Sequence, residues 1–203
     1  FLKLPIVENF SNLNSDVGFL GIPYDVGNSW RPGARFGPRE IRNYSSRYSS
    51  WGGAQQKGYW DINQNKRFLD GVSISDCGDV DVAYYDIDRN RKIITETVKE
   101  ILKAGTFPVI VGGDHSITYP CICAFENYKS LDIIQIDAHL DWIDEVDGIR
   151  YANGSPMRRS MELDFTKNMV QFGIRDIRSR ENDYNFAKSQ GSQIFTRKDI
   201  RQQ

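Results

Sequence analysis

The chain has 203 residues, of which 39% are hydrophobic and 26% charged, and its 26 Lys and Arg nearly balance 27 Asp and Glu. This composition predicts one globular domain with a sizeable core, and a net charge of −1 argues against nucleic acid as a partner. The apolar runs fall far short of the ~18 residues that a membrane span needs, so no membrane partner is expected. Three scattered cysteines do not make a disulfide framework and indicate a reducing, cytoplasmic setting.

The first half of the chain alternates apolar runs with amphipathic stretches. Residues 17–22 predict a strand, and Gly37-Pro38 opens a helix that carries Ile41, Tyr44 and Tyr48 on one face. Residues 49–68 show no period and are expected to be irregular, whereas residues 71–77 predict a second strand. The clearest helix spans residues 88–104, where Asp88 is the expected cap and Gly105 the expected stop.

The second half repeats this alternation. Strands are predicted at residues 108–111, 131–136, 169–174 and 193–195, and helices at 116–126 and 178–189. The apolar strands lack polar alternation, as expected where both faces of a parallel sheet are buried. The fold class is therefore α/β: a three-layer αβα arrangement with a mainly parallel sheet, in a single domain over residues 1–203.

Metal-type ligands follow two of these strands. One stretch reads Gly112-Gly113-Asp114-His115-Ser116 and the other Asp137-Ala138-His139-Leu140-Asp141. Ligands of open parallel sheets bind just beyond the carboxyl ends of the strands, and the only two histidines of the chain both stand there. We expect Asp114 to stabilise its turn rather than to bind, and Cys77 to be a small buried residue.

The spacing of the second stretch suggests how its ligands would converge. If the chain stays extended, Asp137, His139 and Asp141 project to one side. Ligands so placed at the end of a buried strand are costly unless a cation sits among them, and two carboxylates with an imidazole suit Mn²⁺, Ni²⁺ or Zn²⁺. The Gly112-Gly113 turn would aim His115 toward the same place.

These stretches resemble the ureohydrolases, the family of arginase, agmatinase and guanidinobutyrase. The likeness covers residues 17–200 and includes Arg31-Pro32-Gly33-Ala34-Arg35-Phe36-Gly37-Pro38, which is closer to agmatinase-type members than to arginase. Phe172-Gly173-Ile174-Arg175 is similar to a later strand of the family.

The resemblance implies an arginase/deacetylase-like fold and hydrolysis of a small guanidino substrate to urea and an amine by a metal-bridging hydroxide. It implies two divalent cations, Mn²⁺ or, in some relatives, Ni²⁺. Carried over by position, His115 and Asp141 would hold one ion, His139 the other, and Asp137 both, with Asp141 also passing a proton to the leaving amine. Trp30 and Tyr24 would wall the cleft or serve the core. The family also implies a homo-oligomer, a trimer or hexamer.

Two positions depart from the family pattern. No Ser-x-Asp-x-Asp motif, which would supply further ligands, lies between Trp142 and Gln203. We therefore expect a partial domain, incomplete at the C-terminus, whose activity on its own is doubtful. Asn153 stands where many members carry a histidine that shuttles protons or contacts substrate. Its amide can bind substrate but cannot carry a proton near pH 7.

Two other functions compete with this one. The departures give some support to a metal-poor homologue that acts as a structural or regulatory subunit of an oligomer, and metal analysis of the native protein would distinguish it from the enzyme. A one-metal, deacetylase-like hydrolase explains the sequence less well, because it leaves Asp141 beside Asp137 and His139 without a purpose.

Overall fold

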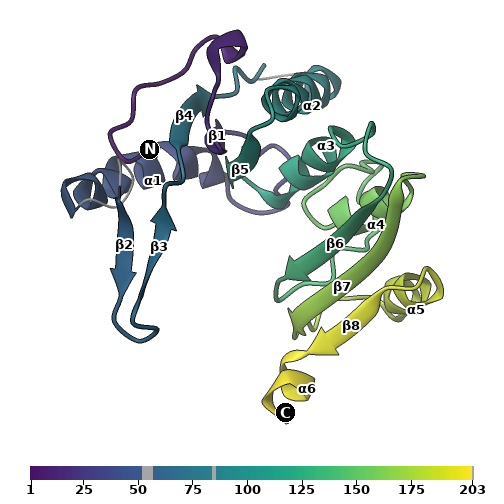
Figure 1. The fold of residues 1–203 in the computed structure, drawn as a ribbon. Helices are drawn as coiled ribbons and strands as arrows, with labels where there is room; N and C mark the ends of the chain where they lie inside the picture. Colours follow the sequence, from purple (N-terminus) through teal and green to yellow (C-terminus); the bar gives the residue numbers. More distant parts are fainter. Residues whose placement is uncertain (52–56, 84–85, 203) are drawn as a thin grey trace. The chain divides into compact units, whose positions relative to one another are not determined.

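The computed structural model describes residues 1–51, 57–83 and 86–202 (Figure 1). The chain forms two compact units, the first from residues 1–25 and 32–113 and the second from residues 26–31 and 114–203. Each unit contains a three-stranded parallel sheet with helices packed against it, which confirms the predicted fold class. Within the described ranges, no helix combines the length and apolar character needed to cross a membrane.

The sheet of the first unit has the order β4-β1-β5. Strand β1 (Val17–Ile22) lies in the middle and pairs in parallel with β4 (Ile74–Asp79) and β5 (Phe107–Gly112). The buried side chains of β1 include Leu20 and Ile22, both fully inaccessible to solvent. All three strands were predicted, because β-branched and other apolar residues cluster locally in each of them.

Two helices pack on this sheet. Helix α2 (Ile87–Lys103) buries Ile94, Val98 and Ile101 and contacts β5, whereas α1 (Gly37–Ser45) contacts β1 and β5. The expected cap of α2 was two residues off: the Asp86 carboxylate accepts from the Arg89 amide at 2.9 Å, and Asp88 pairs with Arg91 instead. Gly105 does stop the helix, with φ of 78°.

Ile41 and Tyr44 of α1 are 50% and 68% exposed, so the face on which they lie is open to solvent. Tyr48, expected on the same helix, lies in the 3₁₀ helix η3 (Ser46–Trp51) and is 64% exposed. Amphipathic spacing thus located the helix but did not show whether this face is covered.

The expectation of irregular structure between residues 49 and 68 is wrong where the chain is described. Strands β2 (Lys57–Asp61) and β3 (Lys66–Asp70) form an antiparallel hairpin in the first unit (Figure 1), while residues 52–56 lie outside the described residues. Stacked rings of Tyr59 and Phe68 stabilise the pair across the strands. Cross-strand pairs of this kind join residues nine positions apart and leave little period in the sequence.

The Arg-Pro-Gly-Ala-Arg stretch is fixed by a buried carboxylate. Asp25, directly beyond β1, is 3% exposed and accepts from the Gly33 amide at 2.6 Å and from Arg35 Nε at 2.6 Å. Burial tends to raise the pKa of Asp25, but hydrogen bonds from Arg35 and Gly33 outweigh it and hold the pKa below its usual range. Asp25 is therefore a structural anion with its own guanidinium partner.

The second unit has the sheet order β6-β7-β8, again parallel. The central strand is β7 (Thr166–Ile174), flanked by β6 (Leu131–Ile136) and β8 (Gln193–Thr196). One face packs into a core of Leu140, Trp142, Met157, Met169 and Ala187.

The described residues of this unit form five helical segments. Three answer to predictions: the 3₁₀ helix η4 (His115–Ile117) with α3 (Thr118–Cys123), and α5 (Glu181–Ser189). Two were not predicted, α4 (Pro156–Met161) and α6 (Arg197–Arg201). Both are about one turn or two long, too short for a helical period to show.

The predicted burial of both sheet faces is not met for β6. Ile134 and Ile136 are 70% and 84% exposed, whereas Gln135 between them is 6% exposed. Strand β5 is likewise half-buried rather than buried along most of its length. Both are edge strands of their three-stranded sheets, so continuous apolar sequence here does not mean cover on both faces.

Candidate metal centre

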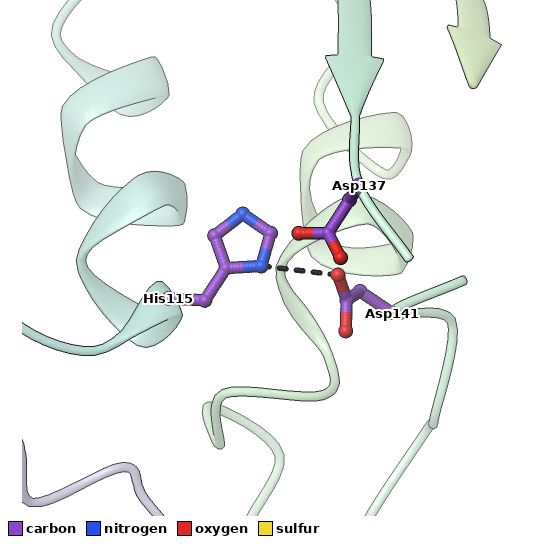
Figure 2. A group of neighbouring side chains, drawn as sticks. All are labelled: His115, Asp137 and Asp141. Carbon is purple, nitrogen blue, oxygen red and sulfur yellow. Dashed lines mark ion pairs between the residues drawn. The ribbon is translucent and has the colours of Figure 1, made fainter. Parts of the chain in front are cut away.

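His115, Asp137 and Asp141 come together in the second unit (Figure 2). The Nδ1 atom of His115 lies 3.0 Å from Oδ2 of Asp141, and one possible ligand atom from each of the three residues falls within 4.8 Å of the others. Figure 2 shows the imidazole ring and both carboxylates turned toward a common space. Three of the four predicted ligands are thus neighbours, although 22 residues or more separate His115 from the two acids in the sequence.

Local hydrogen bonds fix the backbone from which these side chains project. Asp114 is the N-cap of η4, its carboxylate accepting from the Ser116 amide at 2.8 Å, which fixes the helix whose first residue is His115. The expected turn-stabilising role of Asp114 is therefore confirmed. Asp137 follows β6 directly, and its amide donates to the carbonyl of Phe172 at 3.0 Å, so the sheet itself positions this carboxylate.

The expected extended path from residue 137 to residue 141 is wrong. The Asp137 carboxylate accepts from the His139 amide at 2.8 Å, which makes an Asx turn, and Asp141 has a φ of 58°. Side chains therefore do not alternate along this segment. Leu140 nevertheless enters the core, with 2% exposure.

His139 stands apart from the three-residue group because of this turn. Its Nδ1 lies 3.3 Å from Oδ1 of Asp137, and its side chain is 46% exposed. The group of ligand atoms within 4.8 Å contains His115, Asp137 and Asp141 but not His139. The imidazole still touches a carboxylate of the group, so its role as a ligand remains a prediction.

The electrostatics of the group are governed by its two carboxylates. The Asp141 side chain is 8% exposed, and those of His115 and Asp137 are 30% exposed. Burial disfavours the charged form of His115, but the hydrogen bond and charge of Asp141, together with the charges of Asp137 and Asp114, raise its pKa. The site therefore attracts positive charge.

A cavity of about 350 Å³ in the second unit contains the group and several other polar side chains. Asn153 lines it, as expected for a residue that contacts substrate, and its backbone amide donates to the Gly27 carbonyl at 2.9 Å. Trp30 also lines the cavity and is 81% exposed. Tyr24 belongs to the core of the first unit, with 8% exposure, so of its two expected roles the core role holds.

Sequence reasoning missed several residues of this cavity. It is also lined by Asp176, Arg178 and Ser179, which precede α5, and by Asp183 in the first turn of that helix. The Asp176 carboxylate accepts from the Arg178 amide at 2.7 Å and from the Ser179 hydroxyl at 2.9 Å. Their position could have predicted them, because the segment that carries them follows β7 at the same edge of the sheet as Asp137.

The cysteines behave as expected of residues outside the site. Cys77 is 4% exposed, and burial raises the pKa of its thiol to about 11. Cys121 and Cys123, both free, lie on α3. Thiols therefore do not contribute to the group of His115, Asp137 and Asp141.

The donor set of the site fits a divalent cation. Two carboxylates within a few ångströms, with an imidazole as the neighbouring base, leave net negative charge in a partly buried place. Oxygen and imidazole donors without thiolate suit Mn²⁺, Ni²⁺ or Zn²⁺. His115, Asp137 and Asp141 would hold such an ion, with His139 beside them.

The sequence of this chain matches a known protein family and several of its members. Residues 15–203 match the model of the arginase family. The chain belongs to this family. Ureohydrolase relatives include the mitochondrial agmatinase of Gallus gallus, 35% identical over 95% of this chain and 54% of its own length. The guanidinobutyrase of Pseudomonas aeruginosa is 32% identical over 95% of this chain and 59% of its own length.

The arginase-family fold is also found among solved structures. Proclavaminate amidino hydrolase from Streptomyces clavuligerus matches with a TM-score of 0.81 and 29% identity, over 100% of this chain and 63% of that one. The chain thus spans little more than half the length of the curated relatives that it matches. The three named proteins differ in the substrates that their names give, so membership in the family leaves the substrate of this chain open.

Proposed function

We propose that this chain carries part of the active site of a metal-dependent hydrolase that cleaves a carbon–nitrogen bond of a linear guanidino compound. The products would be urea and an amine, and the substrate would be agmatine-like. The observation that carries the proposal is the convergence of His115, Asp137 and Asp141 in one cavity of an arginase-family chain. Relatives named agmatinase and guanidinobutyrase support the class of reaction.

The proposal assigns a pair of divalent cations, manganese or nickel, to four side chains of the second unit. His115 and Asp141 would hold one ion, His139 the other, and Asp137 both. The ions would activate water and stabilise negative charge, which the unreactive guanidinium carbon requires. The reach of His139 toward Asp137, 3.3 Å between Nδ1 and Oδ1, is consistent with its share in the second position.

The side chains around the ligands have separate tasks in this proposal. The Asp141 carboxylate would take up a proton and deliver it to the leaving amine. Asn153 would bind the substrate through its amide, and because an amide does not titrate near pH 7, it would hold no proton. Trp30 and Arg178 line the same cavity, where they would shield or select the tail of the substrate.

The remaining parts of the proposal concern the whole protein. We propose that both units belong to one ureohydrolase domain, supported by a single solved chain that matches all 203 residues. A homo-oligomer, a trimer or hexamer, and a cytoplasmic location complete it. The Gallus gallus relative is named as mitochondrial, so fractionation of cells is the direct check on location.

The test is metal analysis combined with an assay of urea release. The native protein, reconstituted with Mn²⁺, should hold about two ions per subunit and release urea from agmatine or 4-guanidinobutyrate. Purified protein that takes up no metal, or takes it up without hydrolysing any guanidino compound offered, would contradict the proposal. The first outcome would instead favour the metal-poor structural subunit.

A further inference from the structure

Two buried glutamines lie beneath the loop that carries Asp141. Gln135 of β6 and Gln171 of β7 are register partners across the parallel pair. They are 6% and 0% exposed, between a core of apolar side chains and the site. A buried amide is costly unless its donors and acceptors are used, so their contacts show what holds them there.

The amide of Gln171 uses all its hydrogen-bonding positions. Its Nε2 donates to the Leu140 carbonyl at 2.8 Å and also to Oε1 of Gln135. Its Oε1 accepts from Nε1 of Trp142 at 2.9 Å and from Oγ of Ser192 at 2.9 Å. Two donors and two lone pairs are the full capacity of a primary amide.

Gln135 carries this chain of hydrogen bonds to the site. With its oxygen accepting from Gln171, its Nε2 donates to Oδ2 of Asp141 at 2.8 Å and lies 3.5 Å from the His139 carbonyl. The same Oδ2 lies 3.0 Å from Nδ1 of His115. One carboxylate oxygen is thus fixed by an amide on one side and meets the imidazole on the other.

The direction of this chain is set by Trp142. An indole N–H can only donate, so the Gln171 atom facing it must be the oxygen, and the nitrogen of Gln171 must face Gln135. By the same logic the nitrogen of Gln135 faces Asp141, and Oδ2 of Asp141 can only accept. The hydrogen bonds therefore run in one direction, from Trp142 through the two amides to the carboxylate.

The hydrogen bonds of Gln171 also hold the backbone around Asp141. Asp141 has a φ of 58°, a left-handed backbone conformation that is unfavourable for residues other than glycine. Gln171 binds the carbonyl of the preceding residue, Leu140, and the side chain of the following residue, Trp142. Anchors on both sides keep the segment in this conformation.

We infer that Gln135 and Gln171 are positioning residues that aim the Asp141 carboxylate at the cation site and so set the affinity of the site. The inference rests on the proposed function, because it takes Asp141 as a ligand. Neither glutamine lines the cavity itself, so both act on the site through residues that do, above all Asp141.

The experiment is calorimetric titration of the metal-free protein with Mn²⁺ alone, together with its melting temperature. Gln135→Met keeps the length of the side chain but removes the donor to Asp141. Gln171→Glu keeps the acceptors for Trp142 and Ser192 but removes the donors to Gln135 and Leu140. Each should weaken Mn²⁺ binding about 10–100-fold, the usual cost of losing a group that orients a ligand. The control Gln193→Met, exposed on β8, should bind as wild type does.

The outcomes separate the inference from the proposed function. Wild-type protein that binds no Mn²⁺ overturns both. If the wild type binds Mn²⁺ and the folded Gln135→Met and Gln171→Glu variants bind it with the same affinity, the inference alone is overturned. A lower melting temperature with unchanged Mn²⁺ affinity counts as this result, because it marks a purely structural role.

A measurement on the wild type covers variants that fail to fold. Nuclear magnetic resonance of the metal-free protein should show the side-chain amide protons of Gln135 and Gln171 exchanging with solvent at least about 100-fold more slowly than those of Gln193. Exchange as fast as in Gln193 would show that the chain of hydrogen bonds does not exist in solution, and would overturn the inference.

Discussion

The two units place acidic side chains at similar points of their sheets but treat them differently. In the first unit, Asp25 beyond β1 pairs with Arg35, and Asp76 and Asp79 on β4 pair with Arg42. In the second unit, Asp137 and Asp141 beyond β6 pair with the imidazoles of His139 and His115. A guanidinium stays charged at any working pH and neutralises its partner, whereas an imidazole can be neutral and can itself bind a metal. The partner, rather than the acid, separates a structural carboxylate from a candidate ligand.

The strongest test of this contrast is Asp137→Asn. The variant keeps the oxygen that accepts from the His139 amide, so the turn should survive, but a neutral amide cannot bridge two cations. We expect the second ion to be lost and kcat/KM to fall by about 10³-fold, or about 4 kcal/mol of transition-state stabilisation. Elemental analysis and urea release measure both. Two bound ions with near-native turnover would remove Asp137 from the proposed site.

Substitution of Gly113, in the turn that follows β5, should have the next largest effect, in this case on stability. A Cβ at residue 113 would lie 2.2 Å from the carbonyl oxygen of Tyr24, so Gly113→Ala should lower the free energy of unfolding by about 3 kcal/mol. Gly105→Ala is the control, because it adds a methyl in open space at a φ of 78° and should cost only about 1 kcal/mol. Chemical denaturation compares them, and equal losses would show that small shifts of the backbone relieve the overlap at residue 113.

Asp25→Asn tests the structural side of the comparison. It leaves the Arg35 guanidinium, itself one third exposed, without its anion, and should lower the free energy of unfolding by about 1–3 kcal/mol. The number of Mn²⁺ ions bound should not change. If Asp25→Asn lost metal while its stability stayed as in wild type, the division of acids into structural and ligand classes would fail.

The pH dependence of stability gives the smallest effect. The pKa of Asp25 is lower in the folded chain than in the unfolded one, so between the two pKa values the unfolded state binds more protons and stability rises with pH. The contribution is complete above the unfolded value, about 3.9, and disappears as the pH falls through the folded value. Urea denaturation from pH 3 to pH 6 should therefore show a shallower acid slope for Asp25→Asn than for wild type. Parallel slopes would show that Asp25 does not contribute to the pH dependence of stability.

Local patterns were enough to predict most of the regular structure. Helix α2 and strands β1 and β6 were placed within about a residue, because the apolar residues of α2 recur with a helical period and those of β1 and β6 form short continuous runs. Helix α4 and the β2–β3 hairpin were missed, since one is too short for a period and the other depends on pairing across a turn.

The candidate site, too, could be predicted only in part from local sequence. Which residue types follow each strand is a property of the sequence, and so His115, Asp137 and Asp141 could be named as candidate ligands before any coordinates. The Asx turn that displaces His139 was not foreseen, because an extended path and a turn use the same residues and only the hydrogen bond to the Asp137 carboxylate decides between them.

The order of residues along the chain determined the alternation of strands and helices and the chemical type of the groups beyond β5 and β6, because both depend on neighbours within a few positions. Only the tertiary structure decided that the imidazole of His115 meets Asp141, and that Gln171, 30 positions further along the chain, supports this carboxylate through Gln135. Contacts between distant segments are fixed by how the strands align in the sheet, and that alignment is set by packing of the whole unit rather than by any one segment.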